Sequence, residues 1–206
     1  MHIVTRSFFI SACLLVAGSA AAAPLTIDFE DQTVSGGLFP VDAPEIGIVD
    51  GFRFYRPDGM NQGGWINPAI VPSTGNDSSV ALNWCDETCG GTGTVAMEVA
   101  GGGRFDLVGF DFSTYVSDGS TTMDVIGYRT NGGTFNASLL VPIGKDWNTT
   151  VFNWTNLSRV EFIVPTEAFN IGFIDDVVVN NVVPIPAAVW LFGSGLGLLC
   201  WFRRKA

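Results

Sequence analysis

The alternation of apolar and polar residues is the feature that most constrains the fold of this chain. In the stretch LTIDFE, Leu25, Ile27 and Phe29 occupy every second position, with polar residues between them. A strand buried on one face has this two-residue period, whereas a helix has a period of 3.6 residues. Similar runs recur as far as Asn181: Gly51–Tyr55, Val80–Trp84, Thr94–Val99, Phe105–Phe112, Met123–Arg129, Thr134–Val141, Thr149–Trp154, Val160–Val164 and Phe169–Val179.

Turn residues separate these runs. Asp58-Gly59, Asp118-Gly119 and Asn131-Gly132 are dipeptides of the kind that joins antiparallel strands. Roughly ten short strands at this spacing are typical of an all-β protein. We therefore predict one antiparallel jelly-roll β-sandwich over residues 24–181.

The N-terminus differs from this middle region. Arg6 precedes an apolar run from Phe8 to Val16, and a tract of small residues follows up to Ala23. This is the layout of a secretory signal peptide, which we assign to residues 1–23. Export of the domain is the consequence.

The C-terminus has an uncharged run from Val182 to Phe202, followed by Arg203, Arg204 and Lys205. The run is long enough to cross a bilayer as one helix. The basic triplet favours a cytoplasmic end, with the domain on the other side. Residues 182–206 are therefore predicted to form a single membrane anchor.

The same tail contains VPIPAAVWLFGSGL, which starts at Val183 and carries Pro184 and Pro186. It resembles the PEP-CTERM sorting signal, in a variant with Ile185 at the central Glu position of the name-giving motif. The resemblance implies a Gram-negative envelope and an exosortase that recognises the tail near the two prolines. The protein would contact the inner membrane transiently and then reach the cell surface or the exopolysaccharide matrix.

Charge narrows the range of partners. All 20 acidic residues lie in the predicted domain with only 6 of the 10 basic ones, so its net charge is 6 − 20 = −14. Such a surface repels the phosphate backbone of nucleic acid. It is compatible with binding of a divalent cation.

Two cysteines fall within the domain, Cys85 and Cys89 in WCDETCGG. Export to an oxidising compartment favours a disulfide between them. A metal site would need more thiolate or imidazole ligands than the domain contains.

Catalysis is restricted by the absence of histidine from the predicted domain, because His2 lies in the signal peptide. A Ser-His-Asp triad, a Cys-His dyad and a His-ligated zinc site are excluded. Paired carboxylates could still hydrolyse glycosides, but no pair stands out. We assign no catalytic residue and expect a non-enzyme.

A second resemblance covers most of the domain. The segments IDFE, FDLVGFDFS with VIGYRTNGGTF, and WNTTVFNWTNLSRVEFIVPTEAFNIGFIDDVVV are similar to galactose-binding-like jelly rolls, the fold of many carbohydrate-binding modules. In those modules a structural calcium ion lies where the first strand meets the last. The resemblance implies Glu30 and Asp175, with Asp176, as its ligands here.

Alternation in FNIGFIDDVVV places Asp175 on the same inward face as Phe173, Val177 and Val179. A buried carboxylate needs a partner, and a hard cation would supply one. The alternative is that a bulge turns Asp175 outward and that the two aspartates form hydrogen bonds at the strand end.

Tryptophan rings are the remaining candidates for ligand contact. We single out Trp65 and Trp84 as residues that could stack on sugar rings, and expect Trp147 and Trp154 to pack in the core. The sequence as a whole predicts an exported, non-catalytic surface or matrix protein associated with exopolysaccharide. The alternative is a discrete carbohydrate-binding module, and a carboxylate-based glycoside hydrolase is a distant third.

Overall fold

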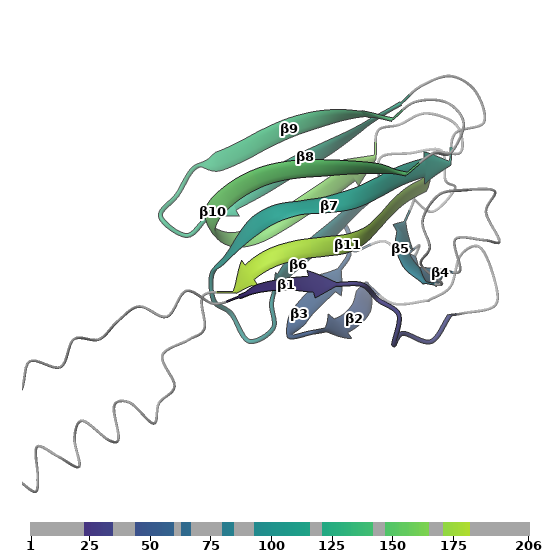
Figure 1. Ribbon diagram of the computed structural model, residues 1–206, viewed down its shortest axis with the longest axis horizontal. Coiled ribbons are helices and arrows are strands. Elements are labelled where there is room, and N and C mark those ends of the chain that lie inside the picture. Colours follow the sequence, from purple (N-terminus) through teal and green to yellow (C-terminus); the bar gives the residue numbers. More distant parts are fainter. Residues whose placement is uncertain are drawn as a thin grey trace, which may run out of the picture.

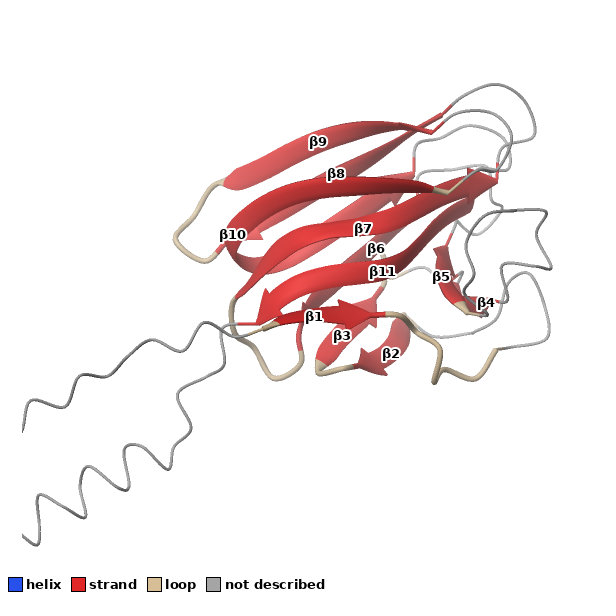
Figure 2. Ribbon diagram, viewed as in Figure 1, coloured by secondary structure: helices blue, strands red, loops and turns tan. Residues whose placement is uncertain are grey.

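The computed structural model describes residues 23–34, 44–59, 63–66, 80–84, 93–115, 121–141, 147–164 and 171–181. Every regular element within them is a β-strand, and every strand pair is antiparallel (Figure 2). The strands are β1 (Pro24–Ile27), β2 (Glu45–Val49), β3 (Phe52–Tyr55), β4 (Gly63–Ile66), β5 (Ala81–Trp84), β6 (Gly93–Val99), β7 (Phe105–Tyr115), β8 (Thr121–Arg129), β9 (Thr134–Val141), β10 (Asn148–Val164) and β11 (Ile171–Asn181).

These observations confirm the predicted all-β, antiparallel class. No helix in the described ranges is long and apolar enough to cross a bilayer. The predicted signal peptide, apart from Ala23, and the whole predicted anchor at 182–206 lie outside the described residues.

The strands form two layers that share β10. Sheet 1 has the order β2-β3-β6-β10-β8-β9. Sheet 2 has the order β4-β5-β11-β7-β10, and β1 pairs with β11 on the same edge as β5. In Figure 1, β1, β11 and β7 lie side by side and β6 passes behind β11.

Strand β10 can belong to both layers because it bends. Its first half pairs with β7, and its second half pairs with β6 and β8. Two bulges separate the halves, and Asn153 and Asn156 adopt φ values of 54° and 62° there. Asparagine tolerates this left-handed conformation better than most residues, so the bend has a local cause in the sequence.

The core lies between the two layers and is rich in aromatic rings. Phe52 of sheet 1 meets Phe105 of sheet 2 with ring centroids 5.2 Å apart. Phe162 of sheet 1 contacts Phe110 of sheet 2 at 5.0 Å, edge to face. These contacts across the layers show a sandwich rather than a single open sheet.

Most predicted strands are confirmed, with three differences. Thr149–Trp154 and Val160–Val164, predicted as separate strands, are parts of the continuous β10. Strands β2 and β4 are additions that the alternation did not indicate, since each is short and contains glycine. The Asn131-Gly132 turn joins β8 to β9 as expected, with the Gly132 amide donating to the Arg129 carbonyl at 3.1 Å.

Candidate ligand-binding face

The outward side of sheet 1 presents charged and aromatic residues in rows across the strands. Arg53 of β3 pairs with Glu98 of β6, Glu98 with Arg159 of β10, and Arg159 with Tyr128 of β8. Paired residues in antiparallel strands point to the same side of a sheet. We call this surface the open face; it comprises Glu45, Arg53, Tyr55, Glu98, Asp124, Ile126, Tyr128, Asn136, Ser138, Arg159 and Glu161.

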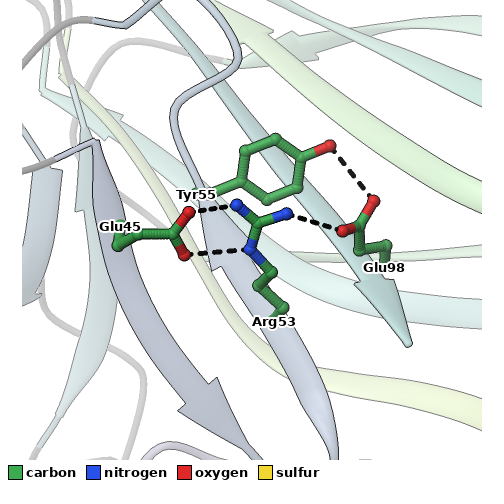
Figure 3. Close-up of polar contacts among 4 residues, drawn as sticks. All are labelled: Glu45, Arg53, Tyr55 and Glu98. Carbon is green, nitrogen blue, oxygen red and sulfur yellow. Dashed lines mark hydrogen bonds and ion pairs between the residues drawn. The ribbon is translucent and has the colours of Figure 1, made fainter. Parts of the chain in front are cut away.

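One cluster on the open face is centred on Arg53 (Figure 3). Its Nη1 donates to Glu98 Oε1 at 2.8 Å, and its Nε donates to Glu45 Oε2 at 2.9 Å. The guanidinium lies over the Tyr55 ring, 4.1 Å from its centroid, and the Tyr55 hydroxyl donates to Glu98 Oε2 at 3.2 Å. Hydrogen bonding from Arg53 lowers the pKa of the Glu45 carboxyl.

A second cluster repeats the arrangement on the neighbouring strands. Arg159 lies over the Tyr128 ring, 4.2 Å from its centroid, and its Nη2 is 3.1 Å from Glu161 Oε1. The Tyr128 hydroxyl donates to Glu161 Oε2 at 2.7 Å. That hydrogen bond, with burial, raises the pKa of Tyr128 and keeps its hydroxyl protonated.

The two clusters are Arg-Tyr-Glu triads that adjoin each other. Arg159 interacts with Tyr55 as well as with Tyr128, which links the triads across β3, β6, β10 and β8. Burial raises the pKa of Tyr55, with Glu98 adding to the effect and Arg159 opposing it. Each side chain is thus held in one orientation by at least two neighbours, which suits recognition of a rigid ligand.

A hollow of about 320 Å³ adjoins the second triad on β8 and β9. Its lining residues are Asp124, Val125, Ile126, Asn136, Ala137 and Ser138. Val125 is buried on the core side, so its backbone rather than its side chain lines the hollow.

Trp65 and Trp84, which we predicted as ligand-binding residues, are in the core. Trp84 is 0% exposed, and its indole N–H donates to the Gly93 carbonyl at 3.2 Å. Trp65 is 8% exposed and packs against Phe29 and Phe54. A sugar cannot reach either ring, so the structure corrects that prediction. Trp147 and Trp154 are partly buried, and Trp154 packs against the core cluster.

The predicted calcium ligands lie near one another, where β1 ends beside the middle of β11. Burial, and then the charges of Asp111, Asp28 and Glu30, raise the pKa of Asp176. Asp175 is 0% exposed and lies opposite Asp111 in the β11–β7 pair. Within the described part of the chain, no three His, Cys, Asp or Glu side chains already form a metal-binding group.

For Asp175 the structure has the alternative prediction, in which a bulge turns the side chain away from the core, and not the inward orientation that strict alternation indicated. A bulge follows Asp175, where Asp176 has a φ of 46°. Ile174 and Val177 therefore both face the core, and Asp175, next to Ile174, is buried on the opposite face of β11.

Other predicted sites lie outside the described residues. These are the Cys85–Cys89 disulfide and the sorting-signal residues Val183, Pro184, Pro186, Arg203, Arg204 and Lys205.

The triads were not predicted from the sequence. In GFRFY the alternation that buries Phe52 and Phe54 also turns Arg53 and Tyr55 outward, and that signal was available. No signal in the sequence indicated that Arg53 and Tyr55 lie beside Glu98 and Arg159, because these strands are far apart along the chain.

No protein-family profile matches this sequence, and no curated protein matches it. Among solved structures, a family 61 carbohydrate-binding module in complex with β-1,4-galactotriose is 14% identical, covering 63% of this chain and 88% of its own, with a TM-score of 0.40. A family 29 carbohydrate-binding module mutant complexed with mannohexaose is 12% identical, covering 78% and 92%, with a TM-score of 0.42. The K3 cleaved adhesin domain of Lys-gingipain from Porphyromonas gingivalis is 10% identical, covering 75% and 97%, with a TM-score of 0.46. At these scores, none of the three assigns a ligand to this chain.

Proposed function

We propose that residues 24–181 form a non-catalytic module that binds carbohydrate on the open face of sheet 1. The observation that carries the proposal is the pair of adjoining Arg-Tyr-Glu triads. They place planar guanidinium and carboxylate groups beside phenol rings on an outward sheet surface. Sugars offer hydroxyls that need such donors and acceptors, and apolar C–H faces that pack on flat rings.

Binding suits this surface better than hydrolysis does. A glycoside hydrolase needs one carboxyl that holds a proton at working pH and a second one that is free to react. Glu98 and Glu161 instead each contact an arginine and a tyrosine hydroxyl. Those contacts favour two fixed carboxylates that accept hydrogen bonds.

Export and exosortase sorting remain part of the proposal, on the strength of the tail sequence alone. A module released by that route would meet exopolysaccharide at the cell surface or in the matrix of a Gram-negative bacterium. A structural calcium ion held by Glu30, Asp175 and Asp176 is a further part of it. Burial, and then repulsion from Asp111, Asp28 and Glu30, raises the pKa of Asp176, and a bound cation would relieve that repulsion.

The test is calorimetric titration of the full-length chain, purified in detergent, with a panel of polysaccharides and their oligosaccharides. We expect saturable binding to at least one polysaccharide and a loss of at least about tenfold in affinity for Tyr128→Ala, which removes both ring and hydroxyl. Val151→Ala, at an exposed position of sheet 2, is the matched control and should bind normally. Absence of binding to every glycan would refute the proposal.

A further inference from the structure

The hollow on β8 and β9 is formed by four outward side chains. Asp124 pairs with Ser138, and Ile126 pairs with Asn136, so two neighbouring cross-strand pairs surround one depression. Cross-strand partners have Cβ atoms about 5 Å apart, and the next pair on the same side is about 7 Å along the strand. At about 320 Å³ the hollow is at the small end of ligand-binding pockets.

The polar groups of the hollow differ from those of the triads. Within the described residues, the Asp124 carboxylate and the Ser138 hydroxyl form no hydrogen bond or ion pair with the protein. Asn136 donates from Nδ2 to Thr134 Oγ1 at 3.2 Å, which leaves its carbonyl oxygen available. The hollow therefore offers two carboxylate oxygens, an amide oxygen and a hydroxyl, with Ile126 as an apolar contact.

The charge of the hollow determines the kind of sugar it can accept. Asp124 is its only charged lining residue. In sheet 1 the cross-strand partners of Asp124 are the uncharged Ser138 and Ile163. The nearest arginine by strand register, Arg159, is engaged with Glu161 and Tyr128. A carboxylate or sulfate group on a ligand would meet an unneutralised negative charge, whereas a neutral hydroxyl can donate to it.

The hollow is continuous with the triads. Ile126 and Tyr128 are two residues apart on the same side of β8, and Ile126 pairs across β10 with Glu161. A sugar ring in the hollow would lie beside a ring contacting Tyr128. An oligosaccharide could thus follow the open face from β9 towards β3.

We infer that this hollow is a subsite for one uncharged sugar ring, which donates hydroxyls to Asp124, Asn136 and Ser138 and packs a C–H face on Ile126. The open face is accordingly selective for neutral polysaccharide over uronate-bearing or sulfated polysaccharide. This inference rests on the proposed function and adds the ligand class and the residues that select it.

The experiment is calorimetry on the full-length chain with neutral hexasaccharides derived from mannan, glucan and galactan, and with a hexa-galacturonate as the anionic probe. We expect one neutral hexasaccharide to bind and the galacturonate to bind at least tenfold more weakly. Asn136→Ala and Ser138→Ala should each weaken the neutral ligand about 3- to 10-fold, the value of one hydrogen bond. Thr149→Ala, which removes an exposed hydroxyl from sheet 2, is the matched control.

Asp124→Asn probes the charge while preserving the shape of the side chain. It should narrow the difference in affinity between the neutral ligand and the galacturonate. Binding that is lost in Tyr128→Ala but unchanged in the Asp124, Asn136 and Ser138 variants would overturn the subsite and leave the proposed function intact. Galacturonate that binds as tightly as the neutral ligand would overturn the selectivity, and failure of every ligand to bind would overturn the proposed function itself.

Discussion

The open face of sheet 1 and the acidic cluster of sheet 2 show two opposite uses of charge within one domain. On the open face, Arg53 and Arg159 are each paired with glutamate. In the acidic cluster, which comprises Asp28, Glu30, Asp111, Asp175 and Asp176, burial and then the negative charges of Asp111, Asp28 and Glu30 raise the pKa of Asp176. Pairs of opposite charge hold the side chains of a surface in one arrangement. Clustered carboxylates repel one another, so their contribution to stability depends on pH and on bound cations.

The largest expected difference between the two regions is in how calcium affects stability, because only the acidic cluster should bind it. If Glu30, Asp175 and Asp176 hold the ion, free calcium at 100 times its Kd should stabilise the domain by about 2.7 kcal/mol. The measurement is thermal unfolding of the full-length chain in calcium and in chelator. Glu30→Gln should reduce the response to calcium with little effect in chelator, because the Glu30 side chain is exposed. Identical melting temperatures for the wild-type chain in calcium and chelator would rule out a calcium site.

The second largest expected effect is the loss of stability on removing an arginine from the open face. Arg159→Met would leave Glu161, which is 9% exposed, without its ion pair. We expect the free energy of unfolding to fall by about 2 kcal/mol, the value of a hydrogen bond to a charged group, as measured by urea denaturation. Arg104→Met, at an exposed position, is the control. Equal effects of the two variants would show that the triad does not stabilise the sheet.

Removing a negative charge from the acidic cluster should instead raise the free energy of unfolding. In chelator at neutral pH, Asp176→Asn should raise the free energy of unfolding by about 0.5 kcal/mol, because it removes a charge that is partly buried and repelled by Asp111. Asparagine also keeps the tolerance for the φ of 46° at this position. Asp50→Asn is a matched control, since Asp50 is exposed and has a φ of 50°. A loss of stability in Asp176→Asn alone would show that the carboxylate makes a favourable contact.

The stability of the Asp176→Asn variant should depend on pH differently from that of the wild-type chain. The pKa of Asp176 is raised in the folded state, so the folded protein binds this proton more tightly than the unfolded chain does. The contribution of Asp176 to stability is therefore largest below its ordinary pKa of 3.8 and decreases as the pH rises to its pKa in the folded state. The stability difference between Asp176→Asn and the wild-type chain, measured in chelator, should widen over that interval and then stay constant. A difference that is independent of pH would exclude titration of Asp176 as its cause.

Much of the sandwich could be predicted because the alternation is local. Thr134–Val141 was predicted with the bounds that β9 has, and the Asn131-Gly132 turn joins β8 to β9 as expected. For Asp175 the structure has the alternative prediction, because the bulge at Asp176 adds a residue to the count without changing the apolar pattern that alone indicated an inward side chain. The tryptophans were misassigned for a related reason: Trp65 and Trp84 stand beside glycine-rich and cysteine-containing loops, yet both pack in the core.

The sequence by itself determined the all-β class, the direction in which most side chains point and the acidic character of the domain. These properties follow from a two-residue period and from composition, which do not depend on distant parts of the chain. Only the tertiary structure decided that β3, β6, β10 and β8 are neighbours and that Arg53, Tyr55, Glu98, Tyr128, Arg159 and Glu161 form one surface. Strand order depends on how the two layers bury their aromatic rings together, and that packing is a property of the whole domain rather than of any single segment.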